Sequence, residues 1–160
     1  MTGNRGAAET HSLRGPIDRA ALTRIRDVVE ETEPLASARL DDPLDPGLLQ
    51  IELAEGLRGA ETARIDVRWT TRDDYAFHYT DSNGLDLRWD RHPHGGDYVH
   101  VPGLEHYHPP PDASSDPSDV EDSCIRVVPE ELVTRAVLKL WRVAYHAGSL
   151  EPLNDGRNPP

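Results

Sequence analysis

The segment that decides the fold is residues 63–91, ARIDVRWTTRDDYAFHYTDSNGLDLRWDR. In three stretches of this segment every second residue is apolar, which is the pattern of a β-strand with one buried and one wet face. The apolar positions are Ala63, Ile65, Val67 and Trp69, then Tyr75, Phe77 and Tyr79, then Leu85, Leu87 and Trp89. The segment therefore predicts an antiparallel meander.

The turn Ser82-Asn83-Gly84 determines how the last two strands of this meander pair. A three-residue loop that ends in glycine places Tyr79 opposite Leu87, so that apolar side chains share one face. A two-residue Asn-Gly turn would place Tyr79 opposite Arg88 and mix the two faces, so we predict the longer loop. The same parity puts three polar residues in one row on the opposite face: Asp66, His78 and Arg88.

Further elements are expected on both sides of the meander. We predict a sheet of four to five strands, at 48–54, 62–70, 75–80, 85–90 and 98–101. Apolar residues at helical spacing predict an N-terminal helix over 16–33 and a C-terminal helix over 129–146. Proline opens each helix, and Gly148 follows the second. The expected fold is α+β, with both helices packed on the face that carries Ile65, Val67, Phe77, Leu87 and Trp89.

The remainder of the chain is expected to be irregular. Residues 1–14 and 148–160 are predicted to be a disordered arm and a disordered tail around one domain, 15–147. Within that domain, residues 109–124 (PPPDASSDPSDVEDSC) contain acids but no base. We therefore expect a solvated acidic loop there.

The composition limits the classes of function. The chain has 29 Asp+Glu against 17 Lys+Arg, and Lys139 is the only lysine. Such a surface is typical of halophilic archaeal proteins, in which concentrated salt screens the repulsion between carboxylates. The excess of negative charge therefore does not require a basic ligand, and it does not exclude RNA as a partner. The region expected to carry the histidines retains five arginines: Arg64, Arg68, Arg72, Arg88 and Arg91.

Several other classes of protein do not fit the sequence. The single cysteine, Cys124, allows no intrachain disulfide and no thiolate zinc cage. The chain has no P-loop, GxGxxG, GxSxG or CxxC motif. No stretch is apolar enough for a membrane span or a signal peptide, so we expect a cytoplasmic protein with no membrane partner.

A histidine-rich segment is the first candidate for chemistry. Residues 91–108 contain five of the eight histidines. In an extended chain the pairs His-x-His point the same way, and neutral imidazole binds zinc and other transition metals. The candidate ligands are His92, His94, His100, His106 and His108, and Asp90, Asp97 or Glu105 could complete a site. The spacing matches no standard zinc motif, and surface hydrogen bonding by loop histidines is the alternative interpretation.

Acid–base chemistry without a metal is the second candidate. Cleavage of RNA through the 2′-hydroxyl needs a base, an acid and a cation for the developing charge. Arg88 would bind phosphate, and Asp90 would orient a histidine. The candidates for proton transfer are His78 and one or more of His92, His94, His106 and His108. The alternative is a solvated ladder of cross-strand charges, in which each pair is worth little.

Two motifs, RWDRHPH at 88–94 and VPGLEHYH at 101–108, resemble the TumE family, which comprises toxins of toxin–antitoxin modules. That family has strands leading into Arg-aromatic-Asp-Asn, then Pro-His-His, then a Phe-Pro element with closing histidines. The chain departs from this pattern at Arg91, where Asn is usual, and at Gly95, where a second His is usual. The resemblance implies a small cytoplasmic toxin that is neutralised by a cognate antitoxin encoded beside it.

The sequence thus leads to three hypotheses. The first is a TumE-like toxin that acts as a metal-independent ribonuclease without a cofactor, with the antitoxin and RNA as partners. The ribonuclease part is our inference from the His, Arg and Asp side chains. The second is a non-catalytic protein-binding module whose partner covers the wet sheet face or the helices. The third is a His-rich protein that binds Zn or another transition metal.

Overall fold

The computed structural model describes residues 12–156, which form the predicted α+β fold. One antiparallel sheet of seven strands follows the order of the chain from edge to edge. The strands are β1 (Ala36–Leu40), β2 (Leu49–Leu53), β3 (Ala63–Trp69), β4 (Tyr75–Asp81), β5 (Asp86–Arg91), β6 (Glu105–His108) and β7 (Glu121–Asp122). The helices are α2 (Arg19–Thr32) and α3 (Glu130–Ala147), with 3-10 turns η1 (Leu57–Gly59) and η2 (Glu151–Asn154).

The predicted register of the meander is confirmed. Tyr79 lies opposite Leu87, and Phe77 lies opposite Trp89. The loop between β4 and β5 closes through the Gly84 amide, which donates to the Asp81 carbonyl at 3.0 Å. Gly84 has a φ of +83°, the left-handed conformation that this type of loop requires and that glycine adopts without strain.

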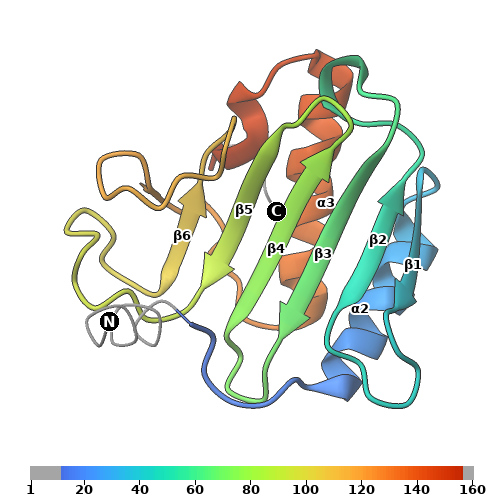
Figure 1. Ribbon diagram of the computed structural model, residues 1–160, viewed down its shortest axis with the longest axis horizontal. Coiled ribbons are helices and arrows are strands. Elements are labelled where there is room, and N and C mark those ends of the chain that lie inside the picture. The colour runs from blue at the N-terminus through green and yellow to red at the C-terminus, as the bar shows by residue number, and fades with distance from the viewer. Residues whose placement is uncertain (1–11, 157–160) are drawn as a thin grey trace.

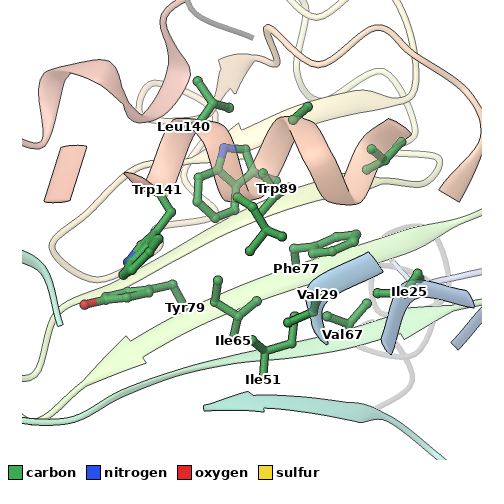
Figure 2. Close-up of a cluster of buried hydrophobic side chains, with 14 of the residues drawn as sticks. Ile25, Val29, Ile51, Ile65, Val67, Phe77, Tyr79, Trp89, Leu140 and Trp141 are labelled. Carbon is green, nitrogen blue, oxygen red and sulfur yellow. The ribbon is translucent and has the colours of Figure 1, made fainter. Parts of the chain in front are cut away.

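Both helices cover the same face of the sheet, as predicted (Figure 1). Side chains of α2 and α3 meet the apolar face of β2 to β5 there, and Figure 2 shows Trp89 and Trp141 among them. Helix α2 begins three residues later than predicted, because the Asp18 carboxylate accepts from the Ala21 amide at 3.0 Å and forms the N-cap. Helix α3 ends at Ala147, one residue later than predicted, and Gly148 follows it in the left-handed conformation.

The sheet has more strands than the four to five that we predicted. Strand β1 was missed because it is an edge strand that follows Pro34 and is only half-buried. Its inward residues are Ala36, Ala38 and Leu40, and Leu40 pairs with Leu49 of β2. Small side chains in a short segment give a weak alternating signal.

The strand predicted at 98–101 is wrong. This stretch turns, and the Val101 amide donates to the Tyr98 carbonyl at 2.9 Å. The strand next to β5 is β6 instead, which places His106 opposite Asp90. Tyr98 and Val101 pack with Val120 in a small separate apolar cluster.

The expectation of a solvated loop at 109–124 is also corrected. Residues 121–122 form β7, which pairs with β6, and Val120 is buried. Because β7 is only two residues long and acidic, its pairing is set by the neighbouring strand and not by its own sequence pattern.

Both predicted disordered ends contain ordered residues. The Arg14 guanidinium binds the buried Asp74 carboxylate at 2.9 and 3.0 Å. Residues 151–154 form η2, and the Trp89 indole donates to the Leu153 carbonyl at 2.9 Å. A buried indole N–H needs an acceptor, which explains why this part of the tail is held against the core. The other residues of the predicted arm and tail, 1–11 and 157–160, lie outside the described range.

The order of the tail can be tested by truncating Leu153, whose exposed fraction is 0%. We expect Leu153→Ala to lower the free energy of unfolding by about 2–4 kcal/mol, because it leaves a cavity in a closed core. Urea denaturation followed by circular dichroism measures the change. Leu44→Ala is the control, because Leu44 is 83% exposed. Equal stability of both variants would show that the tail does not pack.

Candidate functional site

The polar face of the sheet carries the predicted row of Asp66, His78 and Arg88, which is confirmed. The row extends by one strand on either side, to Gln50 on β2 and His108 on β6. A second row lies beside it and contains Asp90 and His106. The two rows bring residues from distant parts of the sequence together on the face that the helices do not cover.

A buried cluster, which we call the Asp90 cluster, is built on these rows. Oδ2 of Asp90 lies 2.8 Å from Nε of Arg88. The same oxygen lies 3.2 Å from Nε2 of His92, 3.3 Å from Nε2 of His108 and 3.7 Å from Nε2 of His106. Asp90 is 1% exposed, and His106 is 0% exposed. One carboxylate oxygen therefore faces one guanidinium and three imidazoles inside the protein.

The loops that flank β6 bury this cluster. The ring of Tyr98 lies 5.4 Å from that of His106 and 6.3 Å from that of His108, measured between ring centroids. The Tyr98 hydroxyl donates to the Ser115 carbonyl at 3.2 Å, which links the loop before β6 to the loop after it. The cover keeps water away from the Asp90 cluster and strengthens the electrostatic interactions inside it.

Backbone carbonyls fix the orientation of the three imidazoles. In each ring, Nδ1 lies within hydrogen-bond distance of a carbonyl oxygen and Nε2 points toward Asp90. The pairs are His92 with Pro93 at 2.8 Å, His106 with Leu104 at 2.8 Å, and His108 with Ser114 at 2.9 Å. An Nδ1–H donated to a carbonyl leaves a lone pair on Nε2 when the imidazole is neutral.

The environment of the Asp90 cluster lowers the pKa of both His106 and Asp90. Burial lowers the pKa of His106 to about 3, although the negative charge of Asp90 opposes the change. Burial by itself would raise the pKa of Asp90, but close contacts with His108 and His92 and the charge of Arg88 hold it well below its ordinary value. His106 is therefore neutral and Asp90 ionised near neutral pH.

A polar pocket of about 470 Å³ opens above part of this cluster. Its wall includes four side chains that can bind or protonate an anion, and an N-terminal segment closes one side. These side chains are Arg68, His78, Arg88 and His92, and the N-terminal residues are Ser12, Leu13, Gly15 and Ile17. Asp66 and Asp90 also line the pocket, whereas His94, His106 and His108 do not belong to its wall within the described residues 12–156.

The structure places the predicted catalytic residues differently: some line the pocket, some lie in the Asp90 cluster, and one does neither. Arg88 and Asp90 join both the pocket and the cluster, and Arg88 Nη2 donates to His108 Nε2 at 3.2 Å. His78 lies in the pocket wall, where its Nε2 contacts the Asp86 carboxylate. His94 is not part of this arrangement, because its Nε2 lies 3.0 Å from the Gly103 carbonyl.

The five predicted metal ligands are also divided. His106 and His108, together with Asp90, offer ligand atoms that lie within 4.8 Å of one another. His92 contacts Asp90, but His94 and His100 direct Nε2 to the backbone carbonyls of Gly103 and Val120. The sequence allowed Asp90 to complete such a site, but its position opposite His106 could be found only from the pairing of β5 with β6.

Arg91 is not part of the polar face. It alternates with Trp89 toward the core side, where its guanidinium lies 4.7 Å from the centre of the Tyr75 ring. It donates to the Val127 carbonyl at 2.7 Å and to the Val128 carbonyl at 3.2 Å, just before α3. The alternation of inward and outward side chains along β5 could have predicted from the sequence that Arg91 points to the core side. Arg91 is therefore a structural clamp that positions α3.

The clamp can be tested with Arg91→Lys. Lysine keeps the charge but cannot bind several carbonyls with one planar group, so we expect the free energy of unfolding to fall by about 2–3 kcal/mol. Arg64→Lys, at a half-exposed position of the polar face, should change it by less than about 0.5 kcal/mol. Chemical denaturation of the two purified variants makes the comparison, and equal losses would contradict the assignment.

The fold and the site define a small α+β protein with a polar, arginine- and histidine-lined pocket on the open sheet face. A family model described as Toxin TumE matches residues 22–136, which include the whole sheet and both histidine motifs, and the chain belongs to this family. Searches of curated proteins and of solved structures give no match. Among residues 12–156, no helix has both the length and the apolar character needed to cross a membrane.

Proposed function

We propose that this toxin cleaves RNA in the polar pocket and is neutralised by a cognate antitoxin protein. The observation that supports this is the lining of the pocket, where two arginines and two histidines meet on one sheet face. Cleavage through the 2′-hydroxyl needs this combination of a cation for the phosphate and groups that accept and donate protons. No metal ion takes part in this proposed reaction.

Arg88 is the proposed phosphate-binding group. Its side chain is 29% exposed, and its Nε and Nη2 are held by Asp90 and His108 below the pocket floor. This anchoring fixes the plane of the guanidinium, so that little conformational entropy is lost when a phosphate binds. Arg68 lines the same pocket from β3 and adds a second cation.

Proton transfer is assigned to the histidines of the pocket wall. His78 lies opposite Arg88 in the register, and its Nε2 contacts the Asp86 carboxylate. Asp86 accepts the Nε2–H and fixes the ring, which leaves Nδ1 to take the proton of a 2′-hydroxyl. His92 is the candidate for the second proton-transfer group, and its Nε2 would have to leave Asp90, 3.2 Å away, to reach a substrate. The sequence hypothesis also named His94, His106 and His108, but these side chains do not line the pocket among the described residues.

The first test is toxicity in cells. Expression of the chain alone should arrest growth of the host, and Arg88→Ala should relieve the arrest because the phosphate loses its anchored cation. Arg64→Ala, on the same face but outside this pocket, should remain toxic. Co-expression of the adjacent gene should restore growth if that gene encodes the antitoxin. A toxic Arg88→Ala variant would favour a non-catalytic protein-binding role over cleavage.

The second test uses purified protein and an RNA oligonucleotide. We expect cleavage that is lost when the nucleotide before the cut carries a 2′-deoxy sugar, because the attacking hydroxyl is then absent. His78→Ala should lower kcat by about 10²- to 10⁴-fold, the range for removal of a general acid or base. His146→Ala, on α3 behind the sheet, is the matched control. Equal cleavage of the 2′-deoxy substrate would exclude this mechanism.

A further inference from the structure

We propose that Asp90, His106 and His108 form a binding site for a divalent transition-metal ion, with Zn²⁺ as its probe. The three side chains lie in the Asp90 cluster and come from two paired strands, β5 and β6. The inference goes beyond the proposed RNA cleavage, which uses the pocket side chains and needs no ion.

The spacing of the three ligand atoms suits such an ion. Oδ2 of Asp90 lies 3.3 Å from Nε2 of His108 and 3.7 Å from Nε2 of His106. A tetrahedral zinc ion lies about 2.0–2.1 Å from nitrogen and oxygen ligands, which sets neighbouring ligand atoms about 3.3 Å apart. Only small side-chain adjustments would therefore bring all three atoms into coordination distance.

The second observation is an unpartnered pair of buried polar atoms. Among residues 12–156, Nε2 of His106 and Oδ1 of Asp90 have no hydrogen-bond partner, and both residues are at least 99% buried. Because the Nδ1–H of His106 is directed to the Leu104 carbonyl, the lone pair of Nε2 faces the negatively charged Oδ2 of Asp90. Two electron-rich atoms opposed in a buried site are unfavourable, and a cation between them would satisfy both.

The backbone supplies the outer support that metal-binding histidines usually have. The carbonyls of Leu104 and Ser114 accept from Nδ1 of His106 and His108, and this fixes the tautomer that presents Nε2 to an ion. Two imidazoles and one carboxylate favour zinc and its transition-metal neighbours, and they leave a coordination position open. Mg²⁺ prefers oxygen ligands, so it should bind poorly here.

Arg88 competes with the ion for the same lone pairs. Its guanidinium donates to Oδ2 of Asp90 at 2.8 Å and to Nε2 of His108 at 3.2 Å. The single lone pair of His108 Nε2 cannot serve an N–H donor and a metal ion at once, and the positive charges of the guanidinium and the ion repel each other. Arg88 opens onto the pocket, so it can withdraw there when an ion enters. Metal binding is therefore linked to the release of Arg88 from the Asp90 cluster.

The test is to treat the full chain with a chelator, which removes bound metal, and then to titrate it with Zn²⁺ in a calorimeter. We expect one ion per chain, confirmed by elemental analysis, and a higher Tm in its presence; Mg²⁺ should produce neither. His106→Gln and His108→Gln should each weaken Zn²⁺ binding at least about tenfold. His100→Gln should bind like the wild type, because His100 is exposed and directs its Nε2 to the Val120 carbonyl.

Arg88→Ala provides a second measurement that does not depend on the stability of the histidine variants. Removing the competing guanidinium should tighten Zn²⁺ binding by about tenfold or more. Unchanged affinity in Arg88→Ala would overturn the competition between Arg88 and the ion. Failure of both the wild type and Arg88→Ala to bind Zn²⁺, or wild-type affinity in folded His106→Gln and His108→Gln, would overturn the site. None of these readouts uses RNA, so the outcome is independent of whether cleavage occurs.

Discussion

The alternation of side chains along β5 is the constraint on which the rest of the structure depends. Trp89 points into the core, where its indole donates to the Leu153 carbonyl and holds the C-terminal turn in place. Arg88 and Asp90 therefore point to the opposite face, and the next residue, Arg91, returns to the core side to hold the segment before α3. A shift of the register by one residue would place two charges in the core and Trp89 in the pocket.

Burial of Asp90 sets the electrostatics of the polar face. An isolated carboxylate in the interior loses hydration that costs several kcal/mol, so it persists only where other groups compensate. Close contacts with His108 and His92 contribute to this compensation, and Arg88 adds the positive charge that the Asp90 cluster always carries. The structure therefore holds an arginine rigidly at the floor of a pocket for a reason of stability, and the same rigidity suits recognition of a phosphate.

The parts of the fold that the sequence predicts are those governed by local rules. Alternation and Gly84 are sufficient to determine the pairing of β4 with β5, and hence the row that joins His78 to Arg88. Strands β6 and β7 escape prediction because their positions depend on pairing with residues distant in the sequence, in a segment rich in glycine and proline. For the same reason the sequence cannot separate His106, which faces Asp90, from His94, which binds a backbone carbonyl.

Arg88 connects the two proposals, because the proposed metal ion would take the place of this side chain in the Asp90 cluster. With Arg88 in place, the carboxylate and His108 satisfy two of its donors, and only the remaining donors can reach a ligand in the pocket. With an ion in place, the whole guanidinium is available to the pocket, and the ion supplies the charge that Asp90 requires. The affinity of the pocket for an anion and the affinity of the cluster for a metal would then be coupled, and such coupling acts equally in both directions.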